Sequence, residues 1–294
     1  MGIHNYLRSI GFKYLKKTEE MKKLIQSIID QPDEKLITED EMGNLFVELK
    51  KEYGDIIGIA VCGTYIDDKD FEMEYYYPYF VGSGVSTKER VEVNKRIDRN
   101  AYAGICDEMR IGVTLIFYLQ NAVEYLREYH SKSKRVPGNA TISALSVEGC
   151  VVLPVYKNES QIKSEEKYSM NRNHLMAAAR DGDEEAMESL TLEDIDTYSM
   201  ISRRIMTEDI LSIVDTYFMP YGMESDQYSI MGEILDCYVI ENEYTKEKSY
   251  VLTLDSNQLT FDVCINQEDL LGEPAPGRRF KGIIWMQGKV HYNI

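Results

Sequence analysis

Residues 251–266 read VLTLDSNQLTFDVCIN, and both halves of this stretch alternate apolar with polar side chains. An alternation with a period of two predicts a β-strand with one buried face. Residues 255–258, Asp-Ser-Asn-Gln, are turn formers and lie between the two halves. The stretch therefore predicts a β-hairpin. The apolar members of its second half are Leu259, Phe261, Val263 and Ile265.

The hairpin lies inside a β-rich segment at the end of the chain, residues 224–294. A long β-type run, 228–240, precedes the hairpin, and a further run, 278–290, follows it and is interrupted by Gly282 and Gly288. Short strands in close succession, with glycines where a strand must bend sharply, are typical of a small closed or half-closed barrel. We therefore expect a small β-barrel-like, OB-like domain here.

The first part of the chain, residues 1–157, predicts an α+β domain with a mostly antiparallel sheet. Apolar residues at i, i+3, i+4, i+7 and i+8 from Met21 to Ile29 predict an amphipathic helix. Residues 31–41 read as a polar connection. Strand patterns joined by turns follow at 56–63, 71–80, 91–97, 101–107, 112–119 and 142–156, with one helical pattern at 121–129.

Between these two parts, residues 158–223 predict a linker and a helical segment. Gly182 breaks the helical pattern, and Asp183 is placed to cap the helix that follows. Two apolar helical faces are expected. The first consists of Leu192, Ile195, Tyr198, Ile201 and Ile205, and the second of Ile210, Leu211, Val214 and Phe218.

The composition is that of a folded, acidic protein. The 294 residues are 44% hydrophobic, and the formal charge of −17 opposes adsorption to nucleic acid or to an anionic membrane. Residues 1–17 lack the apolar run of a signal peptide, and the most apolar run, 111–119, is far shorter than the ~20 residues of a membrane helix. The five cysteines form no C-x-x-C pair. We therefore expect a cytoplasmic protein with reduced thiols.

Several longer motifs along the chain resemble one protein family. They are the Gly58–Gly63 run, YYYPY (75–79), GVTLIFYLQN (112–121), SALSVEG (143–149), AAARDGDEEAMESLTLEDIDTY (177–198), MPYGMESDQYS (219–229) and LLGEPAPGRRFKGIIWMQG (270–288). Together they resemble the Firmicutes proteins known as the domain of unknown function 3881 family, over nearly the whole chain. The resemblance implies a bacterial, single-chain, cytoplasmic protein. It transfers no catalytic or binding residue, because the family has none assigned.

An aromatic run supplies the first candidate binding residues, Tyr75, Tyr77 and Tyr79. Rings that alternate along a strand can stack on a sugar or a base. Half of such a strand normally faces the core, however, and the tyrosine hydroxyl allows a ring to lie at the core boundary. We interpret these tyrosines as core and interface, and an exposed face as a docking surface for a partner.

Arg278, Arg279 and Trp285 supply the second set of candidate binding residues. OB-like barrels bind single-stranded nucleic acid through a basic groove with stacking aromatic rings. Residues 224–294 carry six Lys and Arg against twelve Asp and Glu, which is the wrong sign for such a groove. Docking of a peptide or a subunit fits this charge better.

No catalytic residue, metal ligand or cofactor is predicted. The acids around Gly182 lack the spacing of a calcium loop, and the four histidines lie far apart in the sequence. Gly82-Ser83-Gly84 lacks the third glycine of a dinucleotide-binding loop. A Cys–His pair that meets only in the fold stays an open alternative.

The leading interpretation is a non-catalytic binding, regulatory or scaffold protein for a protein partner or a small ligand, with no membrane association. The first alternative is a metal-independent hydrolase or transferase whose acids converge only in the fold. The second is single-stranded nucleic-acid binding through residues 224–294, against which the charge argues. The oligomeric state is not predicted.

Overall fold

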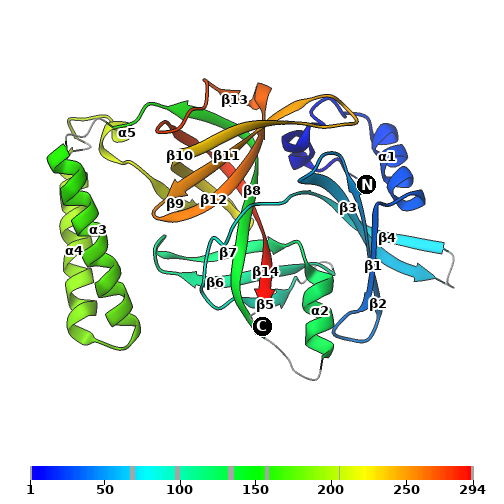
Figure 1. The fold of residues 1–294 in the computed structure, drawn as a ribbon, viewed down its shortest axis with the longest axis horizontal. Coiled ribbons are helices and arrows are strands. Elements are labelled where there is room, and N and C mark those ends of the chain that lie inside the picture. The colour runs from blue at the N-terminus through cyan, green and yellow to red at the C-terminus, as the bar shows by residue number, and fades with distance from the viewer. Residues whose placement is uncertain are drawn as a thin grey trace.

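Two β-sheets carry the fold, and helices cover or extend them (Figure 1). The computed structural model describes residues 2–66, 70–96, 100–131, 136–155, 159–204 and 206–292. The architecture is α+β, as the sequence predicts. The helices are η1 (Asn5–Ile10), α1 (Thr18–Asp30), α2 (Ala122–His130), α3 (Glu159–Arg180), α4 (Glu184–Arg204), α5 (Ile210–Ile213) and η2 (Gln267–Asp269). The strands are β1 (Glu34–Glu39), β2 (Leu45–Glu52), β3 (Ile57–Ile66), β4 (Asp70–Phe80), β5 (Glu92–Lys95), β6 (Tyr102–Glu108), β7 (Val113–Leu119), β8 (Pro137–Val152), β9 (Tyr217–Pro220), β10 (Gln227–Glu241), β11 (Lys248–Ser256), β12 (Leu259–Asn266), β13 (Leu270–Leu271) and β14 (Arg279–Tyr292).

The smaller sheet has the strand order β1–β2–β3–β4, and all of its pairings are antiparallel. Helix α1 packs on β2 and β3. It buries Met21, Leu24, Ile25 and Ile28, which form the apolar stripe that the helical spacing predicts. Burial of a side chain of this size stabilises the fold by about 1.5–3 kcal/mol, so the stripe fixes the helix on the sheet.

The larger sheet has the order β13–β8–β12–β11–β10–β14–β7–β6–β5, and β9 pairs with β10. Strand β8 pairs in parallel with β12 and antiparallel with β14. Because β14 also pairs with β10, the pairing that runs from β8 through β12, β11, β10 and β14 returns to β8. The predicted hairpin at 251–266 is confirmed as the pair β11–β12, with Leu254 opposite Phe261.

Strands from both sides of the predicted linker belong to this larger sheet. Strand β8 comes before residue 158, whereas β12 and β14 come after residue 223. The segments 1–157 and 224–294 therefore share a sheet, and residues 158–223 leave that sheet and return to it. Alternation along one strand reports which face is buried but not which distant strand is its neighbour, so this pairing has no signal in the sequence.

Glycines make room for two aromatic rings inside the larger sheet. A Cβ atom on Gly104 of β6 would lie 2.2 Å from the ring of Phe117, and one on Gly288 of β14 would lie 2.8 Å from the same ring. A Cβ atom on Gly282 would meet the ring of Phe280 at 2.6 Å. Gly282 and Gly288, expected from the sequence at sharp bends, are therefore also positions where a neighbouring ring fills the space of a side chain.

Two buried amides join the two sheets. Gln287 of β14 is fully buried; its Nε2 donates to the Pro78 carbonyl at 2.8 Å, and its Oε1 accepts from the Phe80 amide at 3.2 Å. Gln120 donates from Nε2 to the Phe80 carbonyl and to Gln287 Oε1, both at 2.8 Å. Buried amides of this kind need all of their partners, so they fix β4 against β14.

The helices α3 and α4 form an antiparallel hairpin that stands beside the sheets, opposite the small sheet (Figure 1). Gly182 adopts a φ of 92° between them, and the Asp183 side chain accepts from the Ala186 amide at 3.1 Å. The predicted break and cap are confirmed. None of the helices in the described ranges combines the length and hydropathy of a membrane-spanning helix.

Two local predictions are wrong. Residues 31–41, expected as a polar connection, contain the edge strand β1, in which Ile37 is largely exposed. An edge strand buries little, so its sequence can stay polar. The second apolar helical face, 210–218, is divided between the one-turn helix α5 and the strand β9, which buries Phe218. Ile205 of the first face lies outside the described residues.

Candidate functional site

A cavity of about 200 Å³ lies around Trp285, the only tryptophan of the chain. Its ring contacts three other rings, with centroid distances of 5.0 Å to His4, 5.3 Å to Tyr6 and 5.4 Å to Tyr118. We call this cavity the tryptophan pocket. Its lining consists of His4, Tyr6, Tyr75, Tyr76, Tyr77, Arg96, Tyr118, Glu224, Asp226, Gln227 and Trp285.

Six parts of the chain build the tryptophan pocket. The segment before and within η1 contributes His4 and Tyr6, β4 contributes three tyrosines, and β7 and β14 contribute one ring each. The hydroxyl of Tyr76 donates to the Gly2 carbonyl at 2.7 Å and accepts from the His4 amide at 2.9 Å. These bonds attach the start of the chain to β4 and so position the His4 ring beside the indole.

The polar side of the pocket is an ion pair with a second acid nearby. Asp226 is buried, and its Oδ2 accepts from Arg96 Nη1 at 2.6 Å and from Trp285 Nε1 at 3.0 Å. Glu224 lies at the surface, with its carboxylate 3.8 Å from Arg96 Nη2. The lining thus carries two carboxylates and one guanidinium, a formal charge of −1 with His4 neutral.

Three tyrosines of the pocket, Tyr6, Tyr75 and Tyr77, remain neutral at physiological pH. Burial raises the pKa of Tyr6 above its ordinary value, and the charges of Asp226 and Glu224 raise it further. Burial also raises the pKa of Tyr75 and of Tyr77 well above the ordinary tyrosine value. These three tyrosines therefore present neutral aromatic surfaces to the pocket.

Three of the six candidate residues from the sequence come together here: Tyr75, Tyr77 and Trp285. Tyr79 is buried elsewhere, and its ring fills the space over Gly58 of β3. Their neighbours His4, Tyr6, Arg96, Tyr118, Glu224, Asp226 and Gln227 were not among the candidates. Tyr118 and the last three stand in motifs of the family, but nothing in their spacing relates them to Trp285.

The two arginines of the candidate set have structural contacts. Arg279 is 5% exposed, and its guanidinium donates to the Leu153 carbonyl at 2.7 and 3.0 Å and to the Leu211 and Val214 carbonyls at 2.8 Å each. Arg278 is half-buried and donates to the Glu273 carbonyl at 2.6 Å. Neither arginine lines the tryptophan pocket.

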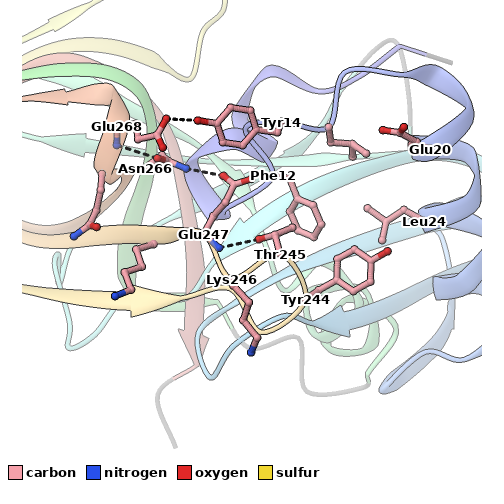
Figure 2. A pocket seen from close by; sticks show the side chains of 13 residues that line it. Phe12, Tyr14, Glu20, Leu24, Tyr244, Thr245, Lys246, Glu247, Asn266 and Glu268 are labelled. Carbon is pink, nitrogen blue, oxygen red and sulfur yellow. Dashed lines mark hydrogen bonds between the residues drawn. The ribbon is translucent and has the colours of Figure 1, made fainter.

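A larger depression of about 700 Å³ lies between the start of the chain and the β10–β11 turn (Figure 2). Phe12 and Leu24 form its buried floor, and Tyr14 and Tyr244 are exposed at its sides. Its polar groups are bonded mainly to one another. Tyr14 donates to Glu268 at 2.5 Å, and Asn266 Nδ2 donates to Glu247 at 2.9 Å (Figure 2). The depression therefore combines an apolar floor with polar side chains, several of which bond to one another.

A buried polar cluster lies in the small sheet. Glu48 accepts from the Tyr77 hydroxyl at 2.6 Å and pairs with Lys50 at 2.9 Å, and the Cys62 sulfur is 4.0 Å away. Burial raises the pKa of the Cys62 thiol well above its usual value, so the thiol is protonated and a poor nucleophile. Within the described ranges, no group of three or more His, Cys, Asp or Glu side chains is placed to hold a metal ion.

A model of one protein family matches residues 7–288. The family is described as "Domain of unknown function, E. rectale Gene description (DUF3881)". The chain belongs to the DUF3881 family. The matched range includes every residue of the tryptophan pocket except His4 and Tyr6. Comparison with the curated proteins found no match, and comparison with the solved structures found none either.

Proposed function

We propose that this DUF3881 protein is a non-catalytic binding protein and that the tryptophan pocket takes the cationic head of a small ligand. The observation that carries the proposal is the position of Trp285, with three rings at 5.0–5.4 Å and the Asp226 carboxylate on its indole N–H. Convergent aromatic rings with a few placed polar groups are the usual lining of a ligand site.

The charge of the pocket favours a cation. Two carboxylates face one guanidinium, and the negative charges of Asp226 and Glu224 are strong enough at Tyr6 to raise the pKa of that phenol. Faces of Trp and Tyr rings attract cations, and the attraction grows when water is excluded. An anionic ligand would have to bind Arg96 in competition with Asp226.

The volume of the pocket limits the size of the ligand. At about 200 Å³ it is smaller than the roughly 300–1,000 Å³ of sites that enclose a drug-sized molecule. An ammonium or guanidinium head fits this volume. Such a head can belong to a free metabolite or to the side chain of a peptide.

The single tryptophan allows a direct test. Tryptophan emission of the full chain should change in a saturable way with choline, agmatine or arginine, and should not change with the neutral tert-butyl analogue of choline. The same cations should raise the melting temperature. Glu224→Gln should weaken binding several-fold, because it removes an exposed carboxylate of the pocket without a buried contact. Glu243→Gln, on the distant β10–β11 turn, is the matched control.

The outcomes test separately whether the pocket is a ligand site and whether its ligand is a cation. If anions bind and cations do not, the pocket is a ligand site of the other charge. If no ligand of either charge alters the tryptophan emission or the melting temperature, the pocket is not a ligand site, and the proposed function fails.

We also propose that β8, β12, β11, β10 and β14 form an OB-like barrel. The return of the strand pairing to β8 supports it, since an OB fold is a five-stranded barrel. An experimental structure, or amide contacts from β8 to both β12 and β14 in solution, would test it. We do not propose nucleic-acid binding, because Arg279 is committed to backbone carbonyls.

The same contacts favour a binding protein over an enzyme, and the cysteines bear on the location. Glu224 and Asp226 both face Arg96, so we favour ligand binding over an acid–base pair of a hydrolase or transferase. We place the protein in the cytoplasm, and the five free thiols support this location. Activity lost on Asp226→Asn in a screen of hydrolase substrates would favour the enzyme instead.

A further inference from the structure

The outer face of α4 carries large apolar side chains in contact with solvent. Leu192, Ile195 and Tyr198 are 57%, 56% and 75% exposed. They are spaced three residues apart, so they follow one side of the helix. Ala186, on another side of the same helix, is 4% exposed. An apolar stripe on a helix normally lies against another element, and this stripe lies against none in the described structure.

The hairpin is held to the rest of the molecule through its other side. Arg180 pairs with Glu89 at 3.0 Å, and Asn173 donates to Gln258 at 2.7 Å. Both contacts come from α3. Arg172 of α3 pairs with Asp194 of α4 at 2.7 Å. Helix α4 is therefore bonded to α3 on its inner side, and its outer face, with Leu192, Ile195 and Tyr198, is exposed to solvent.

Acidic side chains surround the exposed stripe. From Asp181 to Ser202 the chain has eight Asp and Glu and no Lys or Arg. Glu188 and Asp196 lie one turn before and one turn after Leu192, on the same side of the helix, and both are exposed. A stripe of this composition is complementary to a surface that is both apolar and positively charged.

We propose that the outer face of α4 docks a basic amphipathic helix of a partner protein. The Leu192, Ile195 and Tyr198 side chains insert between the apolar side chains of that helix, and the surrounding acids pair with its Lys and Arg. Exposed Met187 extends the apolar surface, and methionine adapts to partners of irregular shape. A second copy of this chain would bring two acidic helices together, at a cost in repulsion.

The test uses the full chain and designed peptides. A Leu/Lys peptide with helical repeat should bind, as followed by fluorescence anisotropy of the labelled peptide. A scrambled peptide of the same composition and a Leu/Glu peptide should bind at least about tenfold more weakly, because they lose the apolar match or the charge match. The affinity for the Leu/Lys peptide should also fall as salt increases.

Variants locate the site. The double variant Ile195→Ser with Tyr198→Ser should weaken binding of the Leu/Lys peptide by about tenfold or more. The double variant Glu188→Lys with Asp196→Lys should abolish the salt-dependent part of the affinity for this peptide. Leu271→Ser, at a side chain 73% exposed on β13, is the matched control and should change nothing. Circular dichroism of each variant checks the helices.

Two results would overturn the proposal. Equal binding of the repeat and scrambled peptides would mean that only charge is sensed. A concentration-dependent dimer that the Ile195→Ser and Tyr198→Ser changes dissolve would assign this face to a second copy.

Discussion

Trp285 donates its indole Nε1–H to the Asp226 carboxylate across 3.0 Å, on the same oxygen that accepts from Arg96 at 2.6 Å. The indole is therefore oriented by a carboxylate from the loop before β10, and that carboxylate is held by a side chain that follows β5. A buried acceptor shared by two donors is costly to remove, because both of these hydrogen bonds are then lost.

Replacement of Asp226 by asparagine should lower the free energy of unfolding by about 2–3 kcal/mol, since the amide cannot satisfy a guanidinium as a carboxylate does. Urea unfolding followed by tryptophan fluorescence measures this loss. Glu224→Gln, at a carboxylate that is 61% exposed and 3.8 Å from Arg96, should change stability little. Equal losses in the two variants would argue against a special role for the buried carboxylate.

Gly104→Ala should destabilise the larger sheet by about 1–3 kcal/mol, because the new methyl group would overlap the Phe117 ring. The loss should shrink when Phe117 is shortened to leucine in the same chain. A double-mutant cycle on the melting transition measures this coupling. Strict additivity of the two changes would contradict the packing described here.

Arg279→Lys should be nearly as harmful as Arg279→Ala, each costing about 2–4 kcal/mol, because an ammonium cannot reach carbonyls on three sides. Hydrogen exchange should quicken in residues 210–216 and after β8. The neighbour Arg278→Ala, which loses one bond at the surface, is the control. Full rescue by lysine would show that only the charge matters.

Glu108 should make the stability of the protein sensitive to acid. Burial alone would raise its pKa, but bonds from Arg110 at 2.6 and 2.7 Å and from Thr87 at 2.8 Å outweigh burial and hold the pKa below its ordinary value. A carboxyl group whose pKa is lower in the folded state stabilises that state at pH values above its unfolded pKa of about 4.3. This stabilisation is lost as the pH falls through the folded pKa.

The stability difference between the wild type and Glu108→Gln should therefore be largest near neutral pH and shrink below about pH 4.3. Urea midpoints measured across that range would show it. Glu208→Gln, in the turn after α4 and at a surface pair with Arg204, is the exposed control and should leave the pH profile nearly unchanged. A difference that stays constant down to the lowest pH would mean that Glu108 does not titrate as described.

Much of the secondary structure can be predicted from alternation and helical spacing, because those patterns record burial on one element. The β11–β12 hairpin and the α1 stripe follow directly from such patterns. The tryptophan pocket does not, because Arg96 and Asp226 are 130 residues apart and neither belongs to a recognisable motif with Trp285. The alternation of rings along one strand indicates Tyr75 and Tyr77 as candidates, but it does not show which rings of other strands they meet.

The helix α4 shows the opposite limit. Its apolar spacing predicts a face that needs cover, and the described chain provides none for Leu192, Ile195 and Tyr198. Spacing reports that a surface is apolar, but it cannot say whether the covering element is in the same chain. Likewise, strand β1 has a polar sequence without a strand pattern, because a strand at the edge of a sheet needs to bury few side chains.

The guanidinium of Arg279 touches the chain where it leaves the larger sheet, at Leu153, and again where it comes back, at Leu211 and Val214. The segment that contains α3 and α4 thus begins and ends beside one side chain, Arg279. Besides these bonds at its two ends, the hairpin is held by the surface contacts of Arg180 with Glu89 and of Asn173 with Gln258. A module with adjoining ends and few other bonds can be exchanged for a short linker while the strands of the sheet keep their places. The DUF3881 fold therefore separates the helical face that we propose as a docking surface from the pocket that we propose as a ligand site.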